Sequence, residues 1–159
     1  MSWPEPVARV AAVLAAAGVD SRIEQFDEGP PTARDAAAAV GCELSQIVKS
    51  IVLVCDGAYV LALVPGDRRA DTGAIAAMLG AAEVRVATRD EVLAATGFEP
   101  GGVAPFPQVA VSRTLIDRSF LRHEVVWIGA GTEEHMAALP PVELARLAGA
   151  IPGDLGSGG

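Results

Sequence analysis

The apolar residues alternate between helical and strand-like spacing, which predicts short helices and strands in mixed order. Residues 5–17 are predicted to form a helix, and Gly18 is typical of the position just past a helix C-terminus. Polar and apolar residues alternate over 22–26, which predicts a short half-buried strand. Thr32 is placed to cap a helix over 33–40, because its hydroxyl can accept a hydrogen bond from the first helical turn.

The strongest pattern in the chain is a pair of apolar runs, 47–55 and 58–64, joined by Asp56-Gly57. An Asp-Gly dipeptide between two strands is typical of a two-residue β-hairpin turn. Both runs are apolar at successive positions, so both faces of each strand are expected to be buried in the middle of a layered core.

The rest of the chain continues the mixture and indicates an α+β (mixed α/β) fold. Its sheet is expected to be largely antiparallel and barrel-like, surrounded by helices. We expect a single domain over 1–152 and a flexible tail over 153–159. The further predicted elements are helices over 71–79, 89–96 and 141–147, strands over 83–86, 109–111, 115–116 and 124–128, and an irregular loop over 97–108.

Charge and composition narrow the function classes. The 159 residues carry a net charge of −8, whereas proteins that bind long stretches of nucleic acid are usually basic, so DNA binding is not expected. No run reaches the roughly 18 apolar residues of a membrane span, and no membrane association is expected. Cys42 and Cys55 have neither zinc-site nor disulfide-framework spacing, and we expect buried thiols in a cytoplasmic protein.

Lys49 is the first candidate functional residue. It is the only lysine among twelve basic residues and lies within the apolar run 47–55. An ammonium in a dry core is unfavourable unless it is paired or reaches a cleft. Two interpretations remain: a solvated strand edge, or a lysine at the mouth of a pocket that binds an anion or a polarised carbonyl.

The glycine-rich loop is the second candidate. Gly101 and Gly102, followed by Val103, Ala104 and Pro105, allow the backbone to approach a ligand closely, so its N–H groups could hold an oxyanion or a phosphate. The alternative is a tight structural turn.

Other polar residues give weaker signals. Asp117 could cap the turn after 115–116 or bind a substrate. His123 and His135 lack metal-ligand spacing, so no metal site is expected and each is interpreted first as a surface or hydrogen-bonded histidine. Arg68-Arg69 indicates a solvated corner, with phosphate contact as the less favoured alternative.

Several segments in order resemble the YbaK/ProX family of free-standing aminoacyl-tRNA deacylases, which are related to the editing domain of bacterial prolyl-tRNA synthetases. The resemblance runs from about residue 5 to 150. Its most specific parts are the lysine in QIVKS and the stretch TGFEPGGVAPF, and it includes these segments: TARDAAAAVG, PGDRRADTGAIAAMLGA, LID at 115–117 and VWIGAG.

The resemblance implies hydrolysis of the ester between a wrong amino acid and the 3′ adenosine of a tRNA, without metal or other cofactor. The most expected substrate is proline tRNA that carries a small wrong amino acid, alanine-like or cysteine. Catalysis would centre on Lys49, Gly101 and Gly102. The residues implied or considered for substrate binding are Thr32, Ser50, Val103, Pro105, Asp117, Gly131 and His135.

The expected partner is the acceptor end of misacylated tRNA, with a prolyl-tRNA synthetase as a further candidate partner. The acidic charge fits a protein that grips only this short end. The alternative function is a non-catalytic module that binds a nucleotide or tRNA end in the same pocket, associated with a synthetase. A fold-level likeness with neither activity is the remaining alternative.

Overall fold

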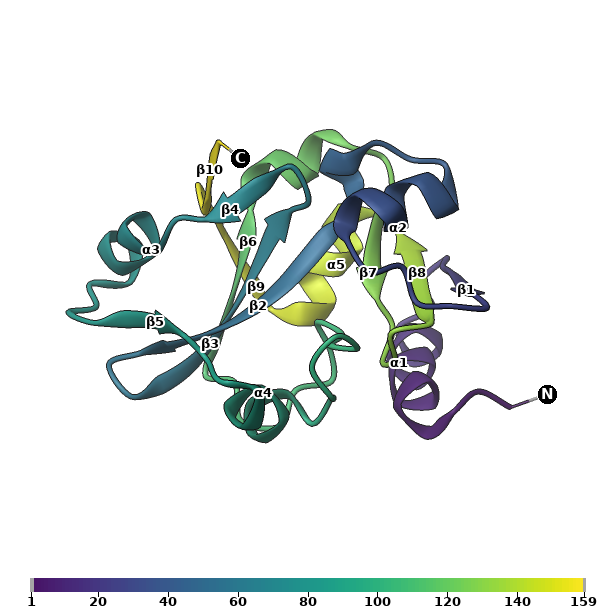
Figure 1. The fold of residues 1–159 in the computed structure, drawn as a ribbon, viewed down its shortest axis with the longest axis horizontal. Coiled ribbons are helices and arrows are strands. Elements are labelled where there is room, and N and C mark those ends of the chain that lie inside the picture. Colours follow the sequence, from purple (N-terminus) through teal and green to yellow (C-terminus); the bar gives the residue numbers. More distant parts are fainter. Residues whose placement is uncertain (1, 159) are drawn as a thin grey trace.

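A computed structural model describes residues 2–158 (Figure 1). The helices are α1 (Glu5–Ala16), α2 (Ala33–Val40), α3 (Thr72–Leu79), α4 (Arg89–Thr96) and α5 (Pro141–Ala148), with 3-10 turns η1 (Leu44–Gln46) and η2 (Arg118–Arg122). The strands are β1 (Arg22–Gln25), β2 (Val48–Cys55), β3 (Ala58–Pro65), β4 (Arg68–Ala70), β5 (Val84–Val86), β6 (Arg113–Asp117), β7 (Val126–Gly129), β8 (His135–Leu139), β9 (Ala150–Gly153) and β10 (Gly156–Gly158).

The described strands form three sheets. The largest has the order β5-β2-β3-β6-β9, in which β2 pairs antiparallel with β5 and β3, while β3–β6 and β6–β9 are parallel. An antiparallel sheet of order β1-β8-β7 and the pair β10-β4 complete the set. The predicted α+β class with a mixed sheet is confirmed, and the described strands form open sheets rather than a closed barrel.

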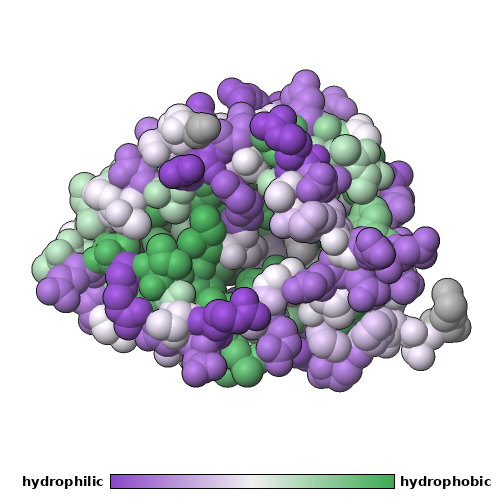
Figure 2. All heavy atoms as spheres, in the orientation of Figure 1, coloured by the Kyte–Doolittle hydropathy of each residue, from purple (hydrophilic) through white to green (hydrophobic). Residues whose placement is uncertain are grey.

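The β2–β3 hairpin crosses the middle of the molecule, with α3 on one side and α1 and the β1-β8-β7 sheet on the other (Figure 1). Its turn forms as predicted, with positive φ at Asp56 and Gly57, which a two-residue hairpin of this kind requires. The Asp56 carboxylate also accepts backbone N–H groups of Ala82 and Glu83, which ties the turn to the segment before β5. In a sphere representation, the same face of the molecule is hollowed near its centre (Figure 2).

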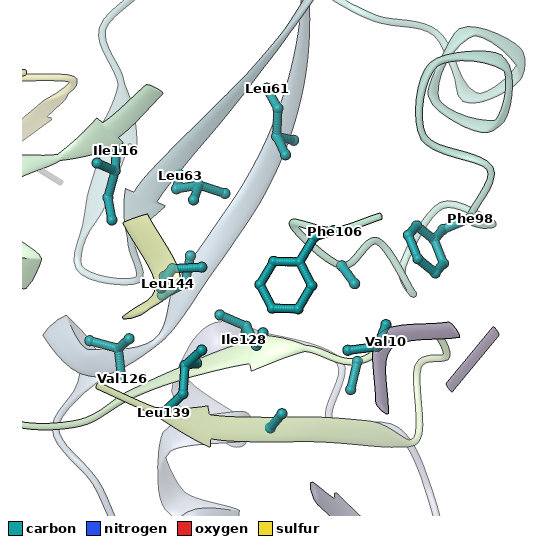
Figure 3. Close-up of a cluster of buried hydrophobic side chains, with 14 of the residues drawn as sticks. Val10, Leu61, Leu63, Phe98, Phe106, Ile116, Val126, Ile128, Leu139 and Leu144 are labelled. Carbon is teal, nitrogen blue, oxygen red and sulfur yellow. The ribbon is translucent and has the colours of Figure 1, made fainter. Parts of the chain in front are cut away.

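Two apolar clusters cover the two faces of the hairpin, as the sequence predicts. One contains Leu53 and Val60 with Ile75 of α3. The larger lies between the five-stranded sheet, the β1-β8-β7 sheet, α1 and α5, and the loop 97–108 contributes Phe98 and Phe106 to it (Figure 3). These two rings anchor the loop that was expected to be irregular, so the glycines between them occupy a fixed position.

The helix ends confirm the predicted capping residues. Thr32 and Thr88 each accept the N–H of the third helical residue, and Gly41 and Gly97 close α2 and α4 in the left-handed conformation. At α4 the Glu91 side chain also returns to the N–H of Thr88, which completes the predicted capping box.

The end of the chain differs from the flexible tail expected over 153–159. Leu155 is fully buried, its carbonyl accepts the N–H of Asp71 at 2.7 Å, and β10 pairs with β4. The Asp117 carboxylate also accepts the N–H groups of Leu155 and Gly156. Long-range hydrogen bonds therefore hold a sequence whose glycines alone favour mobility; Gly159 lies outside the described residues.

Other local predictions also need correction. The expected strand over 109–111 is absent, because Ala110 donates its N–H to the end of α4 and Val109 is exposed. Strands β4, β8 and β9 were missed, although all five residues of β8 are buried. Within residues 2–158, none of the helices has the length and hydropathy needed to cross a membrane.

Candidate active site

A cavity of about 250 Å³, here called the lysine cavity, opens beside the first residues of β2. Four segments far apart in sequence form its wall: the start of α2, the start of β2, the glycine loop and the turn between β7 and β8. Such a volume suits a small side chain or part of a nucleoside. The lining residues are Pro30, Pro31, Thr32, Ala33, Ala36, Ile47, Val48, Lys49, Ser50, Gly101, Val103, Gly129, Thr132, Glu133, His135 and Met136.

Lys49 lies on this wall rather than at a free strand edge. It is the second residue of β2, pairs with Val64 and is half-buried. Its Nζ donates to the backbone carbonyl of Arg68. Burial lowers the pKa of the Lys49 ammonium, and the nearby Asp67 carboxylate acts in the opposite direction. The structure thus supports the interpretation of a lysine at the mouth of a pocket.

Two buried polar atoms around the cavity lack a hydrogen-bond partner among the described residues: Ser50 Oγ and His135 Nε2. His135 is almost fully buried, and its Nδ1 lies 2.6 Å from Thr132 Oγ1, which fixes the ring. Trp3 packs edge-on against the same ring. Buried polar groups are normally paired, so these two unsatisfied atoms distinguish the surroundings of the cavity from an ordinary core.

The glycine loop reaches the lysine cavity through Gly101 and Val103. Neither of their N–H groups has an acceptor within residues 2–158, whereas the N–H of Gly102 donates to the carbonyl of Glu99. Within the glycine loop, the lining residues whose N–H groups lack an acceptor are therefore Gly101 and Val103, whereas the N–H of Gly102 is already engaged.

Gly102 allows the loop to approach the β7–β8 turn, and Gly131 allows that turn to approach the start of α1. A Cβ at Gly102 would lie 2.8 Å from Thr132 Cα, and one at Gly131 would lie 2.7 Å from the backbone of Pro6. Gly131 also has φ +110°, which disfavours other residues. Both glycines position the site from outside the lysine cavity.

Two further predicted site residues also lie outside the lysine cavity. Pro105 lines a different cavity, next to Phe106 and Pro107. Asp117 is buried at the end of β6, where its carboxylate caps η2 and accepts hydrogen bonds from Ser119, Leu155 and Gly156. Burial alone would raise the pKa of Asp117, but these hydrogen bonds outweigh it and hold the pKa below its ordinary value. Of the two interpretations, the structure favours the cap.

Thr32 does line the cavity, but its hydroxyl is engaged by Asp35 as the cap of α2. Ten of the lining residues were not predicted from the sequence, and Glu133 and Met136 are among them. A Cβ at Gly101 would meet Glu133 Oε1 at 2.6 Å, so the exposed Glu133 side chain borders the glycine loop. No spacing along the chain connects Glu133 with Gly101; their contact arises only when the β7–β8 turn folds over the loop.

Comparisons with known proteins identify the family of this chain. Residues 27–147 match the model of the aminoacyl-tRNA editing domain. An uncharacterised protein, YwhH of Bacillus subtilis, is 30% identical over 129 residues, covering 80% of this chain and 82% of YwhH. A proline–tRNA ligase of Bacillus pumilus is 39% identical over 74 residues, which cover 46% of this chain but 13% of the ligase.

A solved structure is similar over nearly the whole chain, with a TM-score of 0.90, 35% identity and coverage of 99% of this chain and 100% of the other. Its description proposes a trans-editing enzyme for prolyl tRNA synthetase. The matched segment 27–147 contains all four wall segments of the lysine cavity. The chain therefore belongs to the aminoacyl-tRNA editing domain family, and its enzymatic class is that of an aminoacyl-tRNA deacylase.

Proposed function

We propose that this protein acts in trans on proline tRNA that carries a small wrong amino acid, alanine-like or cysteine, and hydrolyses the ester without a metal ion. The observation that carries the proposal is the meeting of the only lysine, two unpaired backbone N–H groups and two unpaired buried polar side-chain atoms around one small cavity. These groups can hold a polarised carbonyl, a ribose and an amino group at once.

In this reaction the oxygen of water bonds to the ester carbonyl carbon, and the bond from that carbon to the ribose oxygen breaks. Negative charge develops on the carbonyl oxygen, where Gly101 N–H, Val103 N–H and the Lys49 ammonium would stabilise it. The proton lost by water ends on the leaving ribose oxygen. We assign its transfer to the neighbouring ribose hydroxyl, and the protein contributes mainly positioning.

We assign selectivity to the apolar wall of the cavity. Ala36, Ile47 and Met136 provide this wall, which would accept a small flexible side chain and exclude the rigid ring of proline by its shape. Ser50 and His135 also line the cavity, and their unpaired Oγ and Nε2 atoms would pair with polar groups of the bound substrate once the side chains turn toward it.

Action in trans is supported by the likeness to the solved structure that is described as a trans-editing enzyme for prolyl tRNA synthetase. YwhH and the solved trans-editing candidate are matched over 82% and 100% of their own lengths, whereas the ligase match is a small part of a much longer chain. The partners proposed here are the acceptor end of misacylated tRNA and, as a source of further tRNA affinity, a prolyl-tRNA synthetase.

The test is deacylation of proline tRNAs charged with alanine, cysteine, serine, 2-aminobutyrate or proline, by wild type and Lys49→Ala. We expect rapid hydrolysis of one or two small amino acids, sparing of proline, and a loss of at least about 100-fold in the lysine variant, typical of removing a preorganised charge. The matched control is Arg89→Ala, which removes an exposed cation of α4 outside the lysine cavity.

Wild-type turnover by Lys49→Ala would overturn the assignment of Lys49. If wild type binds every charged tRNA and hydrolyses none, the protein is instead a binding module for the tRNA end. Hydrolysis of cysteine alone, dependent on its thiol, would narrow the substrate and move part of the chemistry from the protein to the substrate.

A further inference from the structure

A second cavity adjoins the lysine cavity and is unusually basic. Its wall includes Arg34, Arg68, Arg69 and Lys49, together with one carboxylate, Asp67. Lys49 belongs to the walls of both cavities, which are therefore neighbours. We call Arg34, Arg68 and Arg69 the arginine patch.

This gathering of cations stands out because the chain has a net charge of −8. Five other arginines are in ion pairs with carboxylates of the protein. The three of the arginine patch are exposed, and none forms an ion pair within residues 2–158. A cluster of unpaired arginines in an acidic protein favours the binding of an anionic ligand.

The backbone fixes the patch in place. The turn between β3 and β4 is fastened to the start of β2 by the N–H of Gly66, which donates to Ile47 O at 2.8 Å. The Arg68 side chain lies over Gly156 of β10, where an added Cβ would meet Arg68 Cβ at 2.9 Å. Arg34 is in the first turn of α2, whose N-terminus borders the lysine cavity. Figure 2 shows hydrophilic side chains gathered over the region of β4.

We propose that the arginine patch binds phosphodiester groups of the tRNA 3′ end while the terminal ester occupies the lysine cavity. This inference rests on the proposed function and assigns the polynucleotide subsite of that site. An ester on the last ribose is followed at once by backbone phosphates, so a tRNA seated in the lysine cavity must run its phosphates over an adjoining surface. Guanidinium groups match phosphate oxygens in charge and geometry.

The proposal also reconciles the acidic chain with a tRNA partner. A patch of three arginines contacts only the few phosphates nearest the ester, so the remaining surface can stay acidic. Affinity is then expected to depend on a short single-stranded end.

The experiment measures binding of a 5′-labelled RNA oligonucleotide ending in ACCA over a range of salt concentrations. Each phosphate contact with a single strand contributes about 0.7 to the slope of log affinity against log salt, or about fivefold in affinity at 0.1 M salt. Arg68→Gln with Arg69→Gln, and Arg34→Gln separately, should lower both quantities by these amounts per arginine. Arg89→Gln and Arg113→Gln, exposed arginines outside both cavities, are the matched controls.

Patch variants with the affinity and salt slope of the controls would overturn the inference. So would displacement of the RNA by adenosine 5′-monophosphate with equal affinity, because that result limits the site to one nucleotide. The assay needs no hydrolysis, which separates the two proposals. Patch-dependent binding by a wild type that cleaves no ester would refute the proposed function alone, and cleavage with patch-independent binding would refute the subsite alone.

Discussion

Two charged residues on inner strands of the same sheet have opposite surroundings. Asp117 ends β6 and is 3% exposed, and its carboxylate accepts three backbone N–H groups and the Ser119 hydroxyl. Lys49 begins β2 and is half-buried, and its ammonium donates to one carbonyl of the protein, that of Arg68. Donors of the protein occupy the acceptor positions of the Asp117 carboxylate. The Lys49 ammonium can still donate further hydrogen bonds at the wall of the lysine cavity.

The contrast separates a structural charge from a functional one. A buried carboxylate with all its acceptor positions engaged holds its donors together, and here it ties the end of the chain to β6. A half-buried ammonium with a single acceptor can take up a carbonyl or phosphate oxygen without first breaking a network. Both residues follow or interrupt apolar runs, and their hydrogen-bond partners in the fold separate the two roles.

The largest expected effect comes from removing the saturated charge. Asp117→Ala leaves the N–H groups of Leu155 and Gly156 without their acceptor and should lower the free energy of unfolding by about 3 kcal/mol. Urea unfolding measures this loss, and Ser119→Ala, which removes one donor to the same carboxylate, should cost about 1 kcal/mol. If Asp117→Ala and wild type had equal free energies of unfolding, Asp117 would have no structural role.

A smaller effect is expected when Lys49 is replaced by another positively charged residue. Lys49→Arg replaces a compact ammonium by a wider planar group, so we expect kcat/KM for misacylated tRNA to fall about tenfold with little change in unfolding free energy. Kinetics on the preferred ester, with unfolding measured in parallel, tests both halves. Full activity in this variant would show that any cation at position 49 suffices.

The parts of the fold that the sequence predicts are those with local causes. The Asp56-Gly57 turn, the Thr32 and Thr88 caps and the apolar runs of β2 and β3 each depend on neighbouring residues, and each forms as expected. Lys49 is likewise conspicuous because its own strand is apolar. Predictions that depend only on neighbouring residues therefore hold in the folded protein.

Features with long-range causes could not be predicted in the same way. Strand β10 has a fixed conformation because it pairs with β4 and because the distant carboxylate of Asp117 accepts the N–H of Gly156. The contact of Glu133 with Gly101 depends on how the loop and the β7–β8 turn pack. The hydrogen bond from the Gly102 N–H to the Glu99 carbonyl is local, but the residue types in the loop do not indicate it. The glycines mark a close approach but leave open which N–H groups stay free.

The smallest expected effect is a pH dependence that distinguishes the two charges. Burial lowers the pKa of Lys49 from the ordinary 10.5, so raising the pH removes its charge earlier than in a free lysine. If the ammonium is the active form, activity should decline with rising pH below 10.5. Asp117 has a lowered pKa and is ionised throughout this range, so it cannot cause the decline.

The measurement is the rate of enzymatic deacylation at increasing pH after subtraction of spontaneous ester hydrolysis. Lys49→Arg supplies the control, because a guanidinium stays charged across this range and its lower rate should not show the decline. A wild-type rate that rises with pH would instead assign the reaction to neutral Lys49 acting as a base. Lys49 would then act in its neutral form, and its positive charge would not be what distinguishes it functionally from Asp117.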